Sequence, residues 1–171
     1  MNNREVVIEA LLSALNREKE PTAKANIVGG LALIADPKTV TSFCDVVKIS
    51  ADKHTICNAI EALKSIRNKQ AIEGLITVFA NSQEAIRLKA VESMIDIGPP
   101  AVDSLILALK DNSSPIRQNA AICLGEMGEE RALEHLIPLL NDEEPNVRGA
   151  AAFALGAIEK QPDSDVNVSY S

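Results

Sequence analysis

The chain repeats itself about every 31 residues, and this period is the strongest constraint on its fold. Leu-Ile pairs and apolar-arginine pairs recur in register in residues 71–100, 101–131 and 132–160: Leu75-Ile76, Leu105-Ile106 and Leu136-Ile137, then Ile86-Arg87, Ile116-Arg117 and Val147-Arg148. Residues 7–38 and 39–70 follow the same outline once one extra residue is allowed in each central loop. The period indicates stacked supersecondary units, because one such unit cannot bury its apolar face alone.

Each unit has the pattern of two helices. In residues 101–131 the apolar side chains Val102, Leu105, Ile106 and Leu109 lie at helical spacing, and a polar turn follows them. Pro115 then stands where a second helix would begin, a position that tolerates its missing N–H. The second helices are rich in small residues: Ala120, Ala121 and Gly125, then Ala151, Ala152 and Gly156. Because glycine inside a helix costs about 1 kcal/mol relative to alanine, we expect these glycines to permit close approach of a neighbouring helix.

The composition supports a helical core. Aromatic residues make up only 2% of the 171 residues, so the core is expected to consist of Ala, Leu, Ile and Val. Such side chains suit closely packed helices better than a β-sandwich. We therefore predict an all-α solenoid of about five hairpins, forming one domain over residues 1–160, with a flexible polar tail at 161–171.

Two segments of the second helices carry a family resemblance. The runs IRQNAAICLGEM at 116–127 and VRGAAAFALGAI at 147–158 resemble HEAT-like repeats of the phycobilin-lyase type. The resemblance implies a right-handed α-α superhelix whose second helices line the concave side. It also implies a ladder between an aspartate in each turn and the arginine that opens the second helix. The matching pairs are Asp111 with Arg117 and Asp142 with Arg148, whereas Asn81 stands opposite Arg87.

The basic positions Lys24, Arg87, Arg117 and Arg148 form a column that could bind an acidic ligand. The structural interpretation is favoured, because each arginine can hydrogen-bond carboxylates and carbonyls of the turns within the stack. Lys64, Arg67 and Lys69 at the end of one second helix could contact phosphate. Cations at a helix C-terminus more often only stabilise the negative end of the helix dipole. The acidic turn Asp142–Glu144 precedes a helix start, where the dipole favours carboxylates.

A second column, in the middle of the second helices, suggests a binding surface. It contains Gly29 or Val28 in the first repeat, then Glu61, Glu92, Ile122 and Phe153. Exposed apolar side chains in a row mark an interaction patch. The hypothesis is that Leu88, Glu92, Gln118, Ile122 and Phe153 form a partner-binding strip on the concave face. The alternative is that Phe153 caps the last repeat or is covered by the C-terminal tail.

The charge distribution constrains the partner. The net charge is −7, with ten Lys/Arg against eight Asp/Glu in residues 1–70 and seven against sixteen in residues 71–171. This balance argues against nucleic acid and favours a protein with a basic surface. The start of the chain lacks a signal peptide, and no apolar stretch reaches the length of a membrane span, about 20 residues. Cysteines without metal spacing favour a reducing, cytoplasmic compartment.

Residues suited to catalysis are few. His54 and His135 lie in separate repeats, and neither has a partner four residues later for metal binding. HEAT-like iron hydroxylases use His-Glu pairs in several repeats, and this chain has no His-Glu dipeptide. Cys44 and Cys123 fall in buried columns, and little near Cys57 would lower its pKa. We therefore expect no catalytic residue, metal or cofactor.

These observations predict a non-catalytic protein-interaction module, such as a scaffold, adaptor or assembly factor, which binds a partner on its concave face. The resemblance suggests an alternative, a phycobilin-lyase-like or chaperone-like subunit that acts with a second protein. DNA binding is a third hypothesis, which the acidic balance disfavours.

Overall fold

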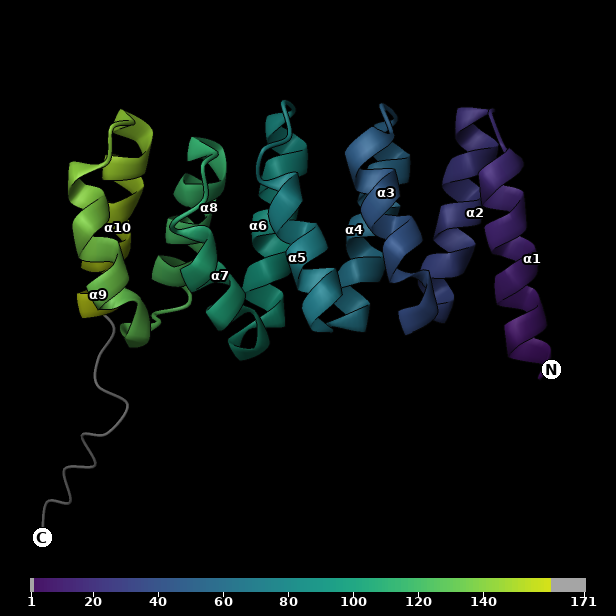
Figure 1. The fold of residues 1–171 in the computed structure, drawn as a ribbon, viewed down its shortest axis with the longest axis horizontal. Helices are drawn as coiled ribbons and strands as arrows, with labels where there is room; N and C mark the ends of the chain where they lie inside the picture. Colours follow the sequence, from purple (N-terminus) through teal and green to yellow (C-terminus); the bar gives the residue numbers. More distant parts are fainter. Residues whose placement is uncertain (1, 161–171) are drawn as a thin grey trace, which may run out of the picture.

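The computed structural model describes residues 2–160, which form helical hairpins arranged side by side in chain order (Figure 1). The α-helices are α1 (Asn3–Arg17), α2 (Pro21–Ile34), α3 (Val40–Ile49), α4 (Lys53–Ile66), α5 (Lys69–Val78), α6 (Glu84–Ile97), α7 (Val102–Ala108), α8 (Ser114–Glu126), α9 (Leu133–Leu136) and α10 (Pro145–Lys160). Short 3₁₀-helices precede or extend first helices: η1 (Pro37–Thr39), η2 (Pro99–Ala101), η3 (Glu130–Ala132) and η4 (Ile137–Asn141). Since residues 2–160 contain no strand, the predicted all-α class is confirmed. The predicted tail at 161–171 lies outside the described residues.

The helices form two layers. The second helices α2, α4, α6, α8 and α10 pack in succession in one layer, and the first helices pack in the other. We call the outward side of the layer formed by α2, α4, α6, α8 and α10 the second-helix face. None of the helices in residues 2–160 has both the length and the apolar character that a bilayer crossing requires.

Side-chain caps set the starts of α1, α2, α4 and α5. Asn2 and Glu5 form a capping box at α1, and the carboxylate of Asp52 accepts a hydrogen bond from the backbone N–H of Thr55 in α4. Pro115 stands in the first turn of α8, as its missing N–H predicts. The turns between paired helices are therefore short and well defined, and they hold each hairpin in a fixed geometry.

The core runs along the whole stack between the two layers. It consists mainly of Ala, Val, Leu and Ile, as the composition predicts. Phe43 and Phe79 are nevertheless fully buried within it. The prediction of a core without aromatic side chains is therefore wrong at these two positions. Burying such a ring removes 150–250 Å² from water on the usual scale, about the largest contribution a single residue makes.

Glycine explains the close contact between α8 and α10, as predicted for one of the two glycines. A Cβ atom at Gly125 would lie 2.5 Å from the Cα of Ala154 and 2.8 Å from its Cβ. Only a residue without a side chain permits this helix spacing. The same prediction is wrong for Gly156, because a Cβ there meets nothing within 4 Å among residues 2–160. Its place at the end of the stack is the physical reason.

The first helix of the last repeat is broken. Residues 133–141 form the short helix α9 followed by η4. Pro138 lies in this segment and has no N–H to donate, so a regular α-helix cannot continue through it. The uninterrupted first helix that the repeat pattern indicates is replaced here by two shorter pieces.

Candidate functional site

A groove on the second-helix face runs between α8 and α10. Gln118, Ile122 and Glu126 line it from one face of α8, since each is four residues after the last. Asn146, Gly149, Ala150 and Phe153 line it from α10, and the groove has a volume of about 380 Å³. Phe153 is 48% exposed, and Ile122 is half-buried. The groove thus offers an apolar centre with amides at one end and a carboxylate at the other.

Small residues keep this groove open. A Cβ atom at Gly149 would meet nothing within 4 Å, so the absence of a side chain leaves space above the floor. Ala150 adds only a methyl group beside it. Gly125 meanwhile allows α8 and α10 to approach closely. The walls are therefore held at a fixed distance by packing beneath them.

The structure brings together only part of the predicted strip. Gln118, Ile122 and Phe153 line the groove, whereas Leu88 and Glu92 lie exposed on α6 and do not. The sequence interpretation missed Glu126, Asn146 and Gly149. Helical spacing from Ile122 could have found Glu126, and alignment with Leu88 and Gln118 could have found Gly149. Asn146 had no such signal.

The same face is polar over α4 and α6. Glu61 pairs with Lys89 and, at 2.9 Å, with Lys64, and Lys64 also lies 3.5 Å from Asp96. The hydrogen bond from Lys89 is the main cause that lowers the pKa of Glu61. Arg67 donates to the backbone carbonyl of Asp96 at 3.4 Å. Lys64 and Arg67 therefore join two repeats, a use that the helix-dipole interpretation did not include.

The arginines of the ladder hold the turns. Arg117 donates through Nη1 to the backbone carbonyls of Asp111 and Asn112 at 2.8 and 3.2 Å. Arg87 and Arg148 make the equivalent bonds to the carbonyls of their own turns. The carboxylate of Asp111 instead accepts from the backbone N–H of Ser113 at 2.8 Å.

The predicted pairs therefore form, but each arginine binds the backbone carbonyl of its aspartate and not the carboxylate. Arg117 forms a two-bond ion pair with Asp142 of the following repeat, Nε to Oδ2 and Nη2 to Oδ1, both at 2.8 Å. These hydrogen bonds lower the pKa of the Asp142 carboxyl and raise the pKa of the Arg117 guanidinium. Stacking places the carboxylate of Asp142 beside Arg117, and a single repeat cannot show this. The carboxylate of Asp111 makes no equivalent pair with Arg87.

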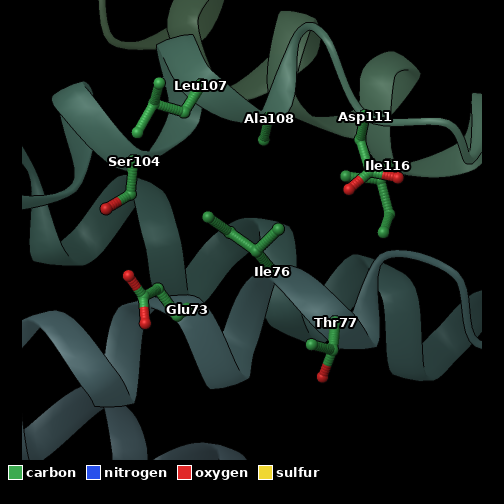
Figure 2. A pocket seen from close by; sticks show the side chains of 8 residues that line it. All are labelled: Glu73, Ile76, Thr77, Ser104, Leu107, Ala108, Asp111 and Ile116. Carbon is green, nitrogen blue, oxygen red and sulfur yellow. The ribbon is translucent and has the colours of Figure 1, made fainter.

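A second groove lies on the opposite side, between α5 and α7 (Figure 2). Its volume is about 300 Å³, and Ile76, Ala108 and Ile116 line its apolar part, with Glu73 and Asp111 at its polar margins. Leu107 at its edge is 69% exposed. The sequence interpretation did not identify this groove. Because Asp111 is engaged with its own turn, we regard the α8–α10 groove as the better candidate.

The remaining titratable groups lie apart. Asp52, His54 and Asn58 line a small cavity of about 240 Å³. His135 lies in the last repeat, far from this cavity in the sequence, with its Nε2 3.5 Å from the carboxylate of its neighbour Glu134. Burial raises the pKa of the Cys123 and Cys44 thiols. Within residues 2–160 no three His, Cys, Asp or Glu side chains gather as a metal site would require. These described residues therefore do not form the His-Glu pairs that HEAT-like iron hydroxylases use.

Comparison with known families gives the chain its class. The pattern of HEAT repeats matches residues 8–95 and 102–166, which is most of the chain. The chain belongs to the HEAT-repeat family. The suspected resemblance to the phycobilin-lyase type is also confirmed at the level of the repeat and fold.

Several curated proteins are similar to this HEAT-repeat protein. Deoxyhypusine hydroxylase from Gallus gallus is 35% identical over 88 residues, which are 50% of this chain and 29% of that protein. The Drosophila melanogaster enzyme is 34% identical over 53% of this chain and 32% of its own length. The phycobilisome maturation protein of Synechococcus elongatus is 29% identical over 69% of this chain and 58% of that protein. The chain thus spans about a third of the hydroxylases it matches.

Solved structures show the same fold. Human deoxyhypusine hydroxylase gives a TM-score of 0.52 at 16% identity, over 89% of this chain and 73% of that chain. The complex of CpcE and CpcF of phycocyanin lyase from Nostoc gives 0.53 at 20% identity, over 95% and 67%. At these identities the likeness shows the fold alone.

The predictions of a non-catalytic interaction module and of a protein that is not an enzyme are contradicted. Curated relatives from Gallus gallus and Drosophila melanogaster are named deoxyhypusine hydroxylase, which is an enzyme, and the structural likeness includes the human one. The error came from treating HEAT repeats without catalytic residues of their own as scaffolds. A repeat fold hosts catalysis as readily as binding, because function depends on particular sites and not on the stack.

Proposed function

We propose that this HEAT-repeat protein is the substrate-binding part of an enzyme that modifies another protein, and that the α8–α10 groove holds a segment of that substrate. The observation that carries the proposal is the apolar pair in the groove, exposed Phe153 and half-buried Ile122. The names of the relatives support it, since they describe a hydroxylase and a maturation protein. Glu126 is the one ionisable side chain in the groove lining, which suits recognition better than bond-making.

The dimensions of the groove suggest a short extended segment. Gln118 and Glu126 are eight residues apart on α8, which corresponds to about 12 Å along the helix. An extended chain covers that length with about four residues. One apolar side chain would rest on Phe153 and Ile122, and the amides of Gln118 and Asn146 would hydrogen-bond the main chain.

The electrostatics favour a cation next to that apolar residue. Glu126 lies one helical turn beyond Ile122, so a lysine or arginine about two positions from the apolar residue would reach its carboxylate. Residues 71–171 hold seven Lys/Arg against sixteen Asp/Glu, which attracts a basic segment. The free cysteines Cys44, Cys57 and Cys123 agree with the reducing, cytoplasmic compartment that we keep as part of the proposal.

Replacing Phe153 with aspartate is expected to abolish binding of such segments. The change removes the exposed ring from the groove and places a charge at the apolar centre, which should weaken binding at least tenfold, or about 1.4 kcal/mol. Fluorescence anisotropy with short peptides that carry an apolar residue two positions from a lysine measures the effect. Circular dichroism should show unchanged helix content, because the ring is half exposed.

Leu107→Asp is the matched control, since Leu107 is an exposed apolar residue on the other side of the stack. It should bind the same peptides as the unaltered protein does. Glu126→Lys should reverse the preference, so that peptides with glutamate in place of lysine bind better. Equal peptide binding by the Phe153→Asp protein would rule out the groove.

A further inference from the structure

The last repeat ends on a surface that resembles the interior of the stack. Leu140 is 40% exposed, whereas Leu109 and Phe79 at the corresponding positions of earlier repeats are 1% and 0% exposed. Ala152 is exposed, whereas Ala121 at the corresponding position is fully buried. In those earlier repeats, the next hairpin covers the position. A terminal repeat that served as a cap would have a polar outer face instead.

A glycine on this surface is set for a close helix contact. Gly125 allows α8 to approach Ala154 of α10 in the next repeat. Gly156 occupies the same place in the last repeat, and a Cβ there would meet nothing within 4 Å among the described residues. A helix could therefore pack on Gly156 as α10 packs on Gly125.

An arginine on the same side lacks the carboxylate that its counterpart has. Arg117 binds two carbonyls of its own turn and the carboxylate of Asp142 from the next repeat. Arg148 binds the carbonyls of Asp142 and Glu143 in the same manner, and no described carboxylate pairs with it. Arg87, inside the stack, also lacks a carboxylate among its described partners, so stacking supplies one to Arg117 and not to every arginine of the column. An acid in the turn of a hairpin stacked on the last repeat would give Arg148 the contact that Arg117 has.

The first repeat offers the complementary surface. Val7 is 48% exposed, whereas Ala71, Ala101 and Ala132 at the corresponding positions are fully buried. On α2, Gly30 holds the place that Ala154 holds on α10, so it leaves room for a close neighbour. Both ends of the stack therefore expose positions that stacking buries elsewhere.

The first repeat also carries a carboxylate at the required place. Asp142 follows the first-helix segment of its repeat, and its side chain accepts the backbone N–H of Glu144 at 3.0 Å. Glu18 follows α1, and its side chain accepts the backbone N–H of Glu20 at 2.8 Å. Asp111 has the same position and the same local bond but makes no pair with Arg87, so this position permits the contact without ensuring it. In a stacked copy, Glu18 would stand where Asp142 stands beside Arg117.

We infer that the protein associates head to tail with a second copy of itself. The C-terminal face of one copy, defined by Ile137, Leu140, Ala152, Leu155 and Gly156, packs on the N-terminal face of the next, defined by Val7, Ala10, Ala14 and Gly30. Arg148 then pairs with Glu18 of the second copy. The two faces lie at opposite ends of the stack (Figure 1), so each added copy exposes a fresh face. Such a heterologous contact forms growing chains instead of closed dimers.

The charge balance agrees with this orientation. Residues 1–70 hold ten Lys/Arg against eight Asp/Glu, and residues 71–171 hold seven against sixteen. Head-to-tail contact brings the acidic half next to the weakly basic half of another copy. Contact between two C-terminal halves would place like charges together.

Gly156→Leu tests the inference in the full chain. Sedimentation velocity should show that the average mass of the unaltered protein rises with concentration, beyond that of a dimer. The leucine fills the space that a stacked helix would need, and association should weaken at least tenfold. The single copy is undisturbed, because a side chain at 156 meets nothing nearby. Gly149→Leu, in the same helix but away from the end, should associate normally.

Charge reversal identifies the second face. Glu18→Arg alone should also weaken association, and the same chain with Arg148→Glu added should recover it. A mixture of the Gly156→Leu and Glu18→Arg proteins should form dimers and stop there, because each retains one open face.

Three results would overturn the inference. One is a full chain that stays monomeric at every concentration. Another is association that Gly156→Leu abolishes but Glu18→Arg leaves intact, which would indicate contact between two C-terminal faces. The third is association only after removal of residues 161–171, which would make that segment the occupant of the C-terminal face.

Discussion

Replacing Arg117 with methionine should lower the free energy of unfolding by about 3–5 kcal/mol, the largest effect expected for any substitution of a charged residue in this chain. The side chains of Arg117 and Asp142 are only 9% and 7% exposed. Without Arg117, the carboxylate of Asp142 would be unpaired and would have little access to water. Two carbonyls of the turn before α8 lose their donor at the same time. Chemical denaturation followed by circular dichroism measures the difference at pH 7.

Arg148→Met serves as the control. Arg148 makes the same carbonyl bonds but lies exposed and has no carboxylate among its described partners, so its loss should cost about 1 kcal/mol. The contribution of the ion pair also depends on pH. Since Arg117 lowers the pKa of Asp142, this stability is present above the unfolded pKa, about 3.9, and is lost as the pH falls through the folded value. A difference between the two variants that survives strong acid would contradict the assignment.

Replacing Gly125 with alanine should destabilise the protein by about 2–3 kcal/mol, although alanine is the better helix former by about 1 kcal/mol. The added methyl would lie 2.5 Å from the Cα of Ala154, and a backbone atom cannot move aside without shifting α10. Thermal unfolding should show the last repeat separating first, because the contact joins it to the repeat before.

Gly149→Ala is the matched comparison, because a Cβ at 149 meets nothing within 4 Å. It should stabilise the protein by up to about 1 kcal/mol through helix propensity alone. If Gly125→Ala were as stable as Gly149→Ala, the close approach of α8 and α10 would not be what selects glycine at 125.

Much of the fold could be predicted because one signal repeats. The Leu-Ile pairs and the arginine after each turn fix the period, and the period implies hairpins that stack. The break at Pro138 and the burial of Phe43 and Phe79 departed from the pattern, because each depends on one residue and not on the repeat. Local chemistry of single positions is averaged away when repeats are aligned.

The groove was harder to predict for a geometric reason. A column of aligned residues selects one face of one helix at a time, so it found Ile122 and Phe153 but also Glu92 and Leu88, which lie outside the groove. The opposing wall depends on how far α10 lies from α8, and Gly125 sets that distance only once the stack exists. The ladder partner of Arg117 was missed for the same reason, since Asp142 belongs to the next repeat.

A comparison of covalent modifications tests the central claim that this HEAT-repeat protein serves an enzyme whose substrate binds the α8–α10 groove. Intact-protein and peptide mass spectrometry would compare cells that lack the gene with cells that express the unaltered, Phe153→Asp or Leu107→Asp protein. We expect a modification on at least one protein to vanish without the gene, return with the unaltered and Leu107→Asp forms, and stay absent with Phe153→Asp. Identical modification in the presence and absence of the gene would contradict the account.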